Sequence, residues 1–293
     1  MSAVTSSEMR KLEEEAMAAG WTEERLMECA GEHLAHAIAR FFPCPGTIIA
    51  YLGKGHNAGD ALVALRFLRD RFHWDIAIRK ALPTERWSPL TQIKLLELGD
   101  PREFTELPPW RTLRGPVVLL DGLLGIGARG PLREPLLSMA REMAWLRNET
   151  GAKVAAIDLP SGTDPDSGEI HPESVIADVT FMIGAAKRGL LCGHAANATG
   201  ALAIVPGEPL RPSEAGESNL ICPQALRIGS APRPFDFHKG KAGRVGILAG
   251  SPAYTGAAVL AATGALRGGA GLITIHTPPE AAECISSKCP PEI

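Results

Sequence analysis

The first 40 residues show the apolar spacing of two helices. In the first segment, small and apolar side chains stand three or four positions apart, at Met9, Leu12, Ala16 and Ala19. Thr5 and Glu8 have the Thr-x-x-Glu spacing of a capping box, which marks a helix N-terminus. Gly20 is expected to end this helix, and a second helix is predicted to run from Thr22 towards Arg40.

From residue 47 the pattern changes to short apolar runs that alternate with amphipathic stretches. Runs that are apolar at successive positions are typical of strands buried on both faces of a parallel sheet. We therefore predict an α/β fold, with a mainly parallel sheet in a Rossmann-like three-layer αβα arrangement. The predicted strands are 47–52, 75–78, 117–120, 154–157, 179–183 and 201–205, and the predicted helices between them are 59–72, 89–98 and 131–147.

A change of composition divides the chain after residue 206. Residues 207–235 are rich in Pro, Ser, Gly and Glu without a clear period, which predicts a linker between domain 1–206 and domain 236–293. The last segment contains a predicted strand at 244–249, a helix at 255–267 and a strand at 272–275. A βαβ unit of about 60 residues buries little surface and leaves strand edges unpaired. We therefore expect 236–293 to be the truncated start of a second α/β domain.

Composition and charge narrow the class of protein. The chain has 293 residues, 45% hydrophobic and 22% charged, and a net charge of −3, so neither nucleic acid nor a membrane surface is expected as a partner. No stretch approaches the ~20 apolar residues of a membrane span, and the N-terminus has no secretory apolar region. We expect a soluble cytoplasmic protein with a small-molecule substrate, and leave a homo-oligomer open. Its cysteines lack metal-binding or CxxC spacing and are expected to be reduced thiols: Cys29, Cys44, Cys192, Cys222, Cys284 and Cys289.

The most conspicuous chemical motif is the glycine-rich stretch 53–60, which follows a predicted strand and opens a helix. Glycines allow close approach of the backbone, and the free N–H groups of a helix N-terminus attract anions, so the stretch predicts a phosphate site. It is neither a dinucleotide fingerprint, because Ala58 stands at the third glycine position, nor a P-loop. Asp60 would repel a phosphate and is expected to meet a hydroxyl or to cap the helix. A tight turn without a ligand is the alternative.

Two further strand ends carry carboxylates. Asp121 ends one strand and precedes a glycine-rich loop, whereas Asp158 ends the next and precedes a Pro-Ser-Gly turn. Carboxylates at the C-terminal ends of parallel strands point into the ligand crevice of an open α/β sheet. Oxygen ligands of this kind suit a hard cation rather than zinc. The alternatives are a flexible loop with a capping Asp at the first position and a plain turn at the second. Lys187 could reach a phosphate or lie in solvent.

In this order, the motifs resemble those of the NAD(P)H-hydrate epimerase family, of the YjeF N-terminal type. The resemblance covers roughly residues 5–206. It rests on Leu26-Met27-Glu28-Cys29-Ala30-Gly31, on the loop 53–60, and on the stretches 121–135, 158–162 and 187–190. Residues 238–272 resemble the start of the nucleotide-dependent NAD(P)H-hydrate dehydratase, which has a ribokinase-like fold. That family's later nucleotide loop and catalytic aspartate have no counterpart here, so this chain is expected to lack dehydratase activity.

The resemblance implies an isomerase that interconverts the R and S forms of hydrated NADH and NADPH. It implies that Asp158 is the acid/base group, with Lys187 as its weaker partner. It implies a potassium ion bound by Asn57, Asp121 and Ser161. It also implies substrate contacts from two loops and from Asp158: His56, Asn57, Ala58, Gly59 and Asp60, then Gly125, Ile126, Gly127, Ala128, Arg129, Gly130 and Pro131.

Departures from the family pattern keep two rivals open. His56 stands where the family usually has Asn, Arg129 where Lys is common, and Ala58 where it has Gly. The Cβ of Ala58 could crowd the ligand or, at positive φ, cost about 1 kcal/mol. The rivals are a catalytically silent nucleotide-binding protein of the same fold and an NAD-dependent oxidoreductase of Rossmann type. The missing fingerprint argues against the oxidoreductase, and the intact Asp121 and Asp158 argue against the silent protein.

Overall fold

A computed structural model describes residues 2–210, 234–291 and 293. The chain divides into two compact units, Met1–Leu226 and Arg227–Ile293, and each is described by itself. Most of the predicted linker 207–235, including Cys222, lies outside the described residues.

The first unit is built on a seven-stranded sheet with the order β4-β3-β2-β5-β6-β7-β9. Every pairing in it is parallel, which confirms the predicted parallel sheet. The predicted strands are all present, whereas the two-residue edge strand β4 has too short a pattern to be predicted. The strands are β2 (Thr47–Leu52), β3 (Asp75–Lys80), β4 (Arg102–Glu103), β5 (Val117–Gly122), β6 (Lys153–Ile157), β7 (Val179–Ile183) and β9 (Ala201–Val205).

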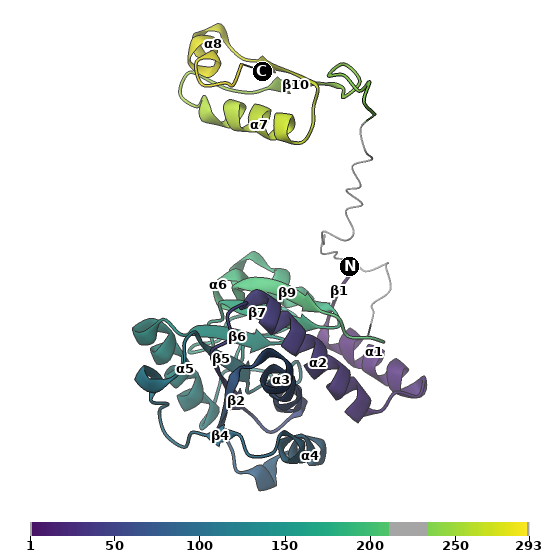
Figure 1. Cartoon of the computed structure of the whole chain (residues 1–293), viewed down its shortest axis with the longest axis vertical. Helices are drawn as coiled ribbons and strands as arrows, with labels where there is room; N and C mark the ends of the chain where they lie inside the picture. The colour runs from purple at the N-terminus through teal and green to yellow at the C-terminus, as the bar shows by residue number, and fades with distance from the viewer. Residues whose placement is uncertain (1, 211–233, 292) are drawn as a thin grey trace. The chain divides into compact units, whose positions relative to one another are not determined.

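Helices cover both faces of this sheet and give the predicted three layers (Figure 1). One core cluster joins side chains of α2 (Glu23–Phe41), α3 (His56–Phe72) and α4 (Pro89–Leu98) to one face of the strands. A second cluster joins α5 (Leu136–Thr150) to the opposite face. Within β2, Ile48 belongs to the first cluster and Ile49 to the second, as the alternation of side chains along a strand requires.

Two helices begin at positions other than those predicted. The helix predicted at 59–72 begins at His56, because the chain turns into the helix within the glycine-rich stretch. The helix predicted at 131–147 begins at Leu136, because the Gly-Pro segment before it remains a loop, and it ends at Thr150 before Gly151 at φ 75°. Ala58 is therefore helical and has no positive φ, so the strain considered for that position does not arise.

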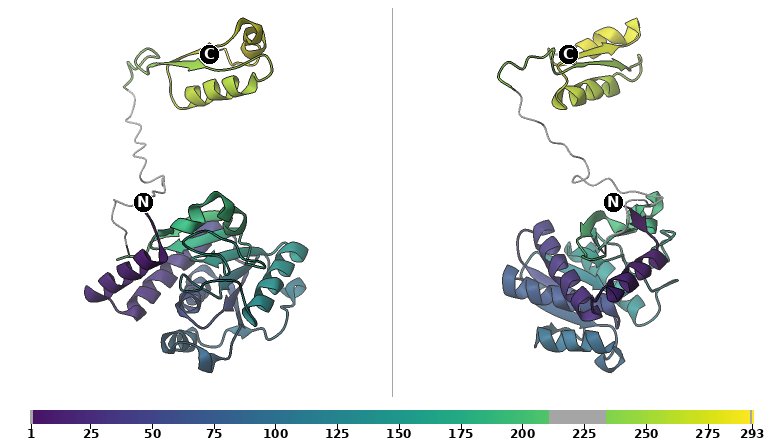
Figure 2. Two further views of the ribbon diagram at one scale, coloured as in Figure 1. Left: turned by 180° about the vertical axis from the view of Figure 1, so that it is seen from behind. Right: turned by 90° about the vertical axis from the view of Figure 1, so that its right-hand side faces the viewer.

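The N-terminal segment is held in place by local and distant contacts. The capping box of α1 (Ser6–Ala18) is confirmed, since the Glu8 amide donates to Thr5 Oγ1 at 3.3 Å and the Thr5 amide donates to Glu8 Oε2 at 2.7 Å. Before it, β1 (Ala3–Val4) pairs in parallel with β8 (Ala186–Lys187), a contact that the sequence did not predict. Figure 2 shows α1 beside α2, and the two helices share an apolar cluster.

The strand order places a crevice at the end of β2. From β2 the chain passes to β3 on one side, whereas β5 pairs with β2 on its other side. This reversal is a topological switch point, where α/β sheets bind ligands at the C-terminal ends of their strands. The stretches that follow β2 and β5 are the two glycine-rich motifs. At Gly53 an added Cβ would lie 1.9 Å from the carbonyl oxygen of Leu123, so only glycine lets the two loops approach this closely.

The second unit contains the predicted βαβ unit. Its strands β10 (Arg244–Leu248) and β11 (Leu272–His276) pair in parallel, and α7 (Gly256–Arg267) connects them. A further helix, α8 (Pro279–Ser286), packs Ala281 and Ile285 against Ala258 of α7.

The remaining helical segments are short. They are Thr84–Arg86, Trp110–Thr112, Arg188–Leu191, Gly193–Ala195 and α6 (Ala196–Thr199). In the parts of the chain that the structure describes, no helix combines the length and apolar character needed to cross a lipid bilayer.

The crossing of α2 and α3 leads to a prediction about stability. A Cβ on Gly31 would lie 2.4 Å from Cβ of Val63, so Gly31→Ala forces the two helices apart. We expect the free energy of unfolding, measured by urea denaturation, to fall by about 1–3 kcal/mol. Gly193→Ala is the control, because its added Cβ meets no atom within 4 Å. Equal stability of the two variants would contradict this account of the crossing.

Candidate functional site

The buried carboxylate of Asp121 connects two strand ends. Its Oδ2 accepts a hydrogen bond from the Ser161 amide at 2.7 Å, and its Oδ1 accepts from Ser161 Oγ at 2.7 Å and from the Leu123 amide at 3.1 Å. Asp121 and Ser161 are completely buried. Burial raises the pKa of Asp121 to about 6, against the hydrogen bonds from Ser161 and Leu123, which lower it. No Lys or Arg in residues 2–210 forms an ion pair with this carboxylate.

Asn57 joins the same group from the third strand end. Its Nδ2 donates to the carbonyl oxygen of Leu124 at 2.8 Å, and the Leu124 amide donates to Ser161 Oγ at 3.1 Å. The chain of hydrogen bonds therefore runs from the first turn of α3, which follows β2, through the loop after β5, to the turn after β6. The structure thus brings together Asn57, Asp121 and Ser161, the three residues predicted to hold potassium.

The oxygen atoms of this group are of the kind that hard cations prefer. They comprise one carboxylate, one hydroxyl and the amide oxygen of Asn57, which accepts no hydrogen bond from the described residues. Such ligands suit alkali and alkaline-earth cations rather than zinc or copper. A cation here would offset the burial of Asp121, which has no positive partner among residues 2–210. Groups of three or more His, Cys, Asp or Glu side chains arranged as metal ligands do not occur in the described residues.

Asp158 and Lys187 form a close ion pair at the end of β6. Lys187 is completely buried, and its Nζ donates to Asp158 Oδ1 and to the carbonyl oxygen of Ile183, the latter at 2.8 Å. The Ile183 amide also donates to Asp158 Oδ1 at 3.1 Å. Asp158 has φ 67°, in the left-handed region that costs a residue with a Cβ roughly 1–2 kcal/mol. Strain of this kind is concentrated at functional sites.

Two adjoining cavities meet at Asp158. The larger, of about 510 Å³, lies between the loops after β2 and β5 and is lined by residues 53–57 and 123–128. The smaller, of about 140 Å³, is mostly apolar and is lined by Met9, Met17 and Met27 among others. Both cavities share four polar side chains: Glu13, His56, Asp60 and Asp158.

Some of the residues predicted to contact substrate line the cavities, and others do not. His56, Asn57, Asp60, Asp158 and 125–128 line them. Ala58 belongs to the sheet core instead, and Gly59 packs against α2, where an added Cβ would lie 2.5 Å from the Met27 sulfur. The cavity linings do not include Arg129, Gly130 or Pro131.

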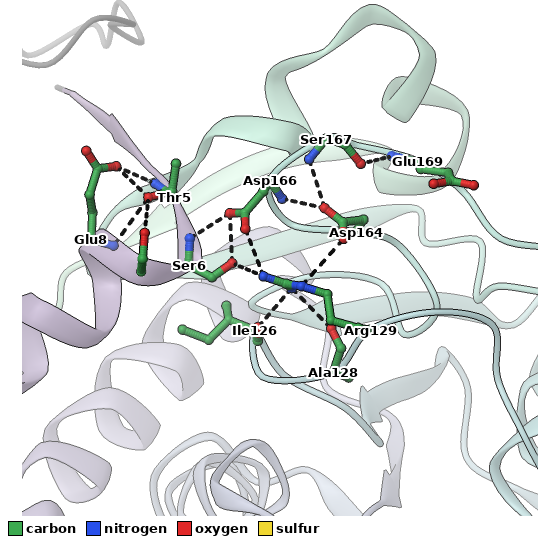
Figure 3. A network of polar contacts seen from close by, with 11 residues as sticks. Thr5, Ser6, Glu8, Ile126, Ala128, Arg129, Asp164, Asp166, Ser167 and Glu169 are labelled. Atoms are coloured by element: carbon green, nitrogen blue, oxygen red, sulfur yellow. Dashed lines mark hydrogen bonds and ion pairs between the residues drawn. The ribbon is translucent and has the colours of Figure 1, made fainter.

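Arg129 lies in a polar network that joins α1 to the loops of the site (Figure 3). Its guanidinium donates to Asp166 Oδ2 and to Ser6 Oγ, each at 2.8 Å, and lies 3.7 Å from Asp164. Asp166 Oδ1 accepts from the Ser6 amide at 2.6 Å and from Ser6 Oγ at 2.7 Å. The carboxylate of Asp166 therefore binds the N-terminus of α1, and Arg129 links that helix to the loop after β5.

Asp60 and Glu13 have unusual electrostatic surroundings. Burial, with the charges of Asp158 and Glu13, raises the pKa of Asp60 well above its usual range, against the opposing effect of Lys187. Burial also raises the pKa of Glu13, and Asp158 adds to that rise. Sequence motifs missed Glu13, whose position in α1 differs in no visible way from those of Glu14 and Glu15. Only its place in the lining of both cavities distinguishes it.

The raised pKa of Asp60 predicts a gain in stability when its charge is removed. The folded state favours the neutral acid of Asp60. Its contribution to the free energy of unfolding is therefore fully present below the unfolded-state pKa of about 4, and it is lost as the pH rises towards the folded-state pKa. The free energy of unfolding of Asp60→Asn at pH 7 is therefore expected to exceed that of the parent by about 0.5–2 kcal/mol. The variant should accordingly unfold at a higher temperature. The difference should shrink towards pH 4.

Asp70→Asn is the matched control on the same helix. The hydrogen bond from Arg69 lowers the pKa of Asp70, so its neutral replacement is expected to give no gain at pH 7. An Asp60→Asn protein no more stable than the parent at pH 7 would contradict the assignment of a buried, destabilised carboxylate.

Comparison with known proteins adds two family matches and a group of relatives. Residues 23–189 match the model of the YjeF-related protein N-terminus, and residues 245–293 match that of the NAD(P)H-hydrate dehydratase. Bifunctional NAD(P)H-hydrate repair enzymes Nnr from Pyrobaculum aerophilum and Gloeobacter violaceus are each 34% identical to this chain over 99% of its length. The chain spans 58% of the length of either relative.

A solved structure shows the same fold. The crystal structure of the yeast protein ynu0 has a TM-score of 0.56, covers 64% of this chain and 83% of its own, and is 24% identical. The likeness supports the Rossmann-like architecture described above. The match over residues 23–189 shows that the chain belongs to the YjeF-related protein N-terminus family.

Proposed function

We propose that this chain interconverts the R and S forms of hydrated NADH and NADPH. The observation that carries the proposal is the Asp158–Lys187 pair, because the carboxylate of Asp158 lines the cavity at the topological switch point of the sheet. The relatives named as bifunctional NAD(P)H-hydrate repair enzymes support the choice of substrate. A free dinucleotide cofactor for redox chemistry is disfavoured, because the sequence lacks the dinucleotide fingerprint.

The reaction requires an acid/base group beside the hydrated ring. In the hydrate, the hydroxyl sits on a carbon bonded to the ring nitrogen, whose lone pair weakens the C–O bond. Epimerisation needs the hydroxyl to leave, or the ring to open, and to return on the opposite face. Asp158 is proposed to hold or move the proton in this step, while Lys187 fixes the orientation of its carboxylate.

The two loops are proposed to hold the dinucleotide. The larger cavity offers the start of α3 at His56 and Asn57, which suits a phosphate, and the backbone of 125–128. Burial raises the pKa of Asp60 and so favours its neutral form, which would donate a hydrogen bond to a substrate hydroxyl. A potassium ion at Asn57, Asp121 and Ser161 would offset nearby negative charge and tie the three strand-end loops together.

The organisation of the chain is part of the same proposal. Residues 1–206 would form the epimerase domain, 207–235 a linker, and 236–293 part of an NAD(P)H-hydrate dehydratase domain, as the match over 245–293 supports. The cysteines among the described residues are free thiols, which supports the proposed cytoplasmic location because thiols stay reduced there. Self-association into a homo-oligomer is compatible with the proposal.

The direct test is a coupled assay. Purified protein is mixed with the R-hydrate and a separate S-specific dehydratase, and consumption of the R-hydrate is followed by absorbance. We expect the protein to accelerate consumption of the R-hydrate. In Asp158→Asn the rate should be about 10²–10⁴-fold lower than in the parent, which is the usual contribution of an acid/base group.

Asp70→Asn, an exposed change remote from the cavities, is the control and should keep the parent rate. A parent protein that does not accelerate R-hydrate consumption would refute the proposed function. Full activity in Asp158→Asn would refute the role of that residue.

A further inference from the structure

Helix α1 brings to the cavities a carboxylate that the mechanism above does not use. Glu13 is half-buried and lines both the larger and the smaller cavity. Asp60 of α3 and Asp158 at the end of β6 line the same two cavities as Glu13. Within the described residues, no group donates a hydrogen bond to the Glu13 carboxylate or forms an ion pair with it.

The position of Glu13 is fixed by contacts on either side of α1. Before the helix, Val4 of β1 pairs with Lys187 of β8, the lysine that binds Asp158. At the helix N-terminus, Ser6 is bound by Asp166, which follows Asp158 in the chain (Figure 3). The helix that carries Glu13 is thus attached to the two segments that supply the acid/base pair.

The charges that act on Glu13 come from every side of the cavity. Burial is the main cause of the raised pKa of Glu13, and the charge of Asp158 adds to it. The side chains of Lys187, His56 and Arg10 lower this pKa. Asp60 and Glu13 also repel each other. The charged or titratable neighbours are Arg10 on α1, Glu23 on α2, Lys54 in the loop before α3, His56 and Asp60 at the start of α3, Asp158 after β6 and Lys187 in β8.

We propose that Glu13 is the second acid/base group of the epimerase and serves the ring face that Asp158 does not reach. This inference rests on the proposed function. The hydroxyl leaves from one face of the ring and returns to the other, and Asp158 is held on one side by Lys187 and the Ile183 amide. A carboxylate fixed in this way can exchange protons with only one face. Glu13 reaches the same cavity from a different element.

The step balances without an oxidant or a reductant. The Glu13 proton passes to the hydroxyl oxygen, the C–O bond breaks, and its electron pair leaves with the oxygen as water. The lone pair of the ring nitrogen forms a C=N bond at the same carbon. Water then adds to the opposite face, the C=N electrons return to nitrogen, and the proton released by that water passes to Asp158. In the opposite direction, Asp158 gives the proton and Glu13 receives it.

Asp60 is less suited to this role than Glu13. A group that gives a proton in one direction and receives it in the other must exist in both forms near neutral pH. Burial and the charges of Asp158 and Glu13 raise the pKa of Asp60 well above its usual range, and Lys187 alone opposes that rise. The rise in the pKa of Glu13 is opposed by three cationic side chains, Lys187, His56 and Arg10, which favour its ionised form.

The test compares three substitutions on α1 in the coupled R-hydrate assay. Glu13→Gln keeps the shape of the side chain but cannot give a proton, so kcat should fall by about 10²–10⁴-fold while KM stays unchanged. Glu13→Asp restores a carboxyl group and should recover part of kcat. Glu14→Gln changes the exposed neighbour and should keep the parent values.

The outcomes separate this inference from the function on which it rests. A parent protein without activity refutes the proposed function itself. An active parent with full kcat in Glu13→Gln, or with only KM raised, refutes the role of Glu13 alone. A loss of kcat in Glu13→Gln that Glu13→Asp does not recover points to packing of α1 and also refutes it.

Discussion

The buried carboxylate of Asp121 is the interaction on which the architecture of the site depends. A charge without a cationic partner is costly in a protein interior unless hydrogen bonds satisfy it. Ser161 and Leu123 provide those bonds, and they belong to the turn after β6 and the loop after β5. Asn57 extends the connection to the first turn of α3, which follows β2. One buried acid thus fixes the relative positions of three strand ends.

The remaining walls of the site are attached to this centre from outside the sheet. Lys187 reaches in from β8 to hold Asp158, and β1 pairs with the same short strand. Arg129 and Asp166 bind the start of α1, and side chains of that helix line both cavities. The result is a cavity lined by carboxyl groups from α1, α3 and the end of β6, the last of which is bound by the buried Lys187. That arrangement suits transfer of protons rather than of hydride.

Much of the fold and part of the site could be predicted from local patterns. Runs of apolar residues marked the strands, and a carboxylate directly after such a run marked Asp121 and Asp158 as crevice residues, because parallel strands end at one edge. Contacts between distant segments could not be predicted. The pairing of β1 with β8 involves only two residues on each strand, which carries no period. Glu13 is one of three consecutive glutamates, and only tertiary packing selects it.

The glycine-rich stretch shows the same limit within one motif. Its composition indicated a loop, but the helix begins at His56, so Ala58 and Gly59 face the core and α2 rather than the cavity. Similarly, Arg129 belongs to a motif predicted to bind substrate, yet it binds Asp166 and Ser6. Sequence located the stretch that forms the site, whereas the direction of each side chain depended on where the helix started.

Thermal unfolding in potassium and in sodium, at equal ionic strength, tests the central role of Asp121 most directly. A ligand that binds only the folded state raises its stability, so the account predicts a higher melting temperature in potassium chloride than in sodium chloride. The difference should disappear in Asp121→Asn, which lacks the charge that a cation would offset. Equal melting temperatures of the parent in the two salts, or a potassium effect that survives in Asp121→Asn, would contradict the account.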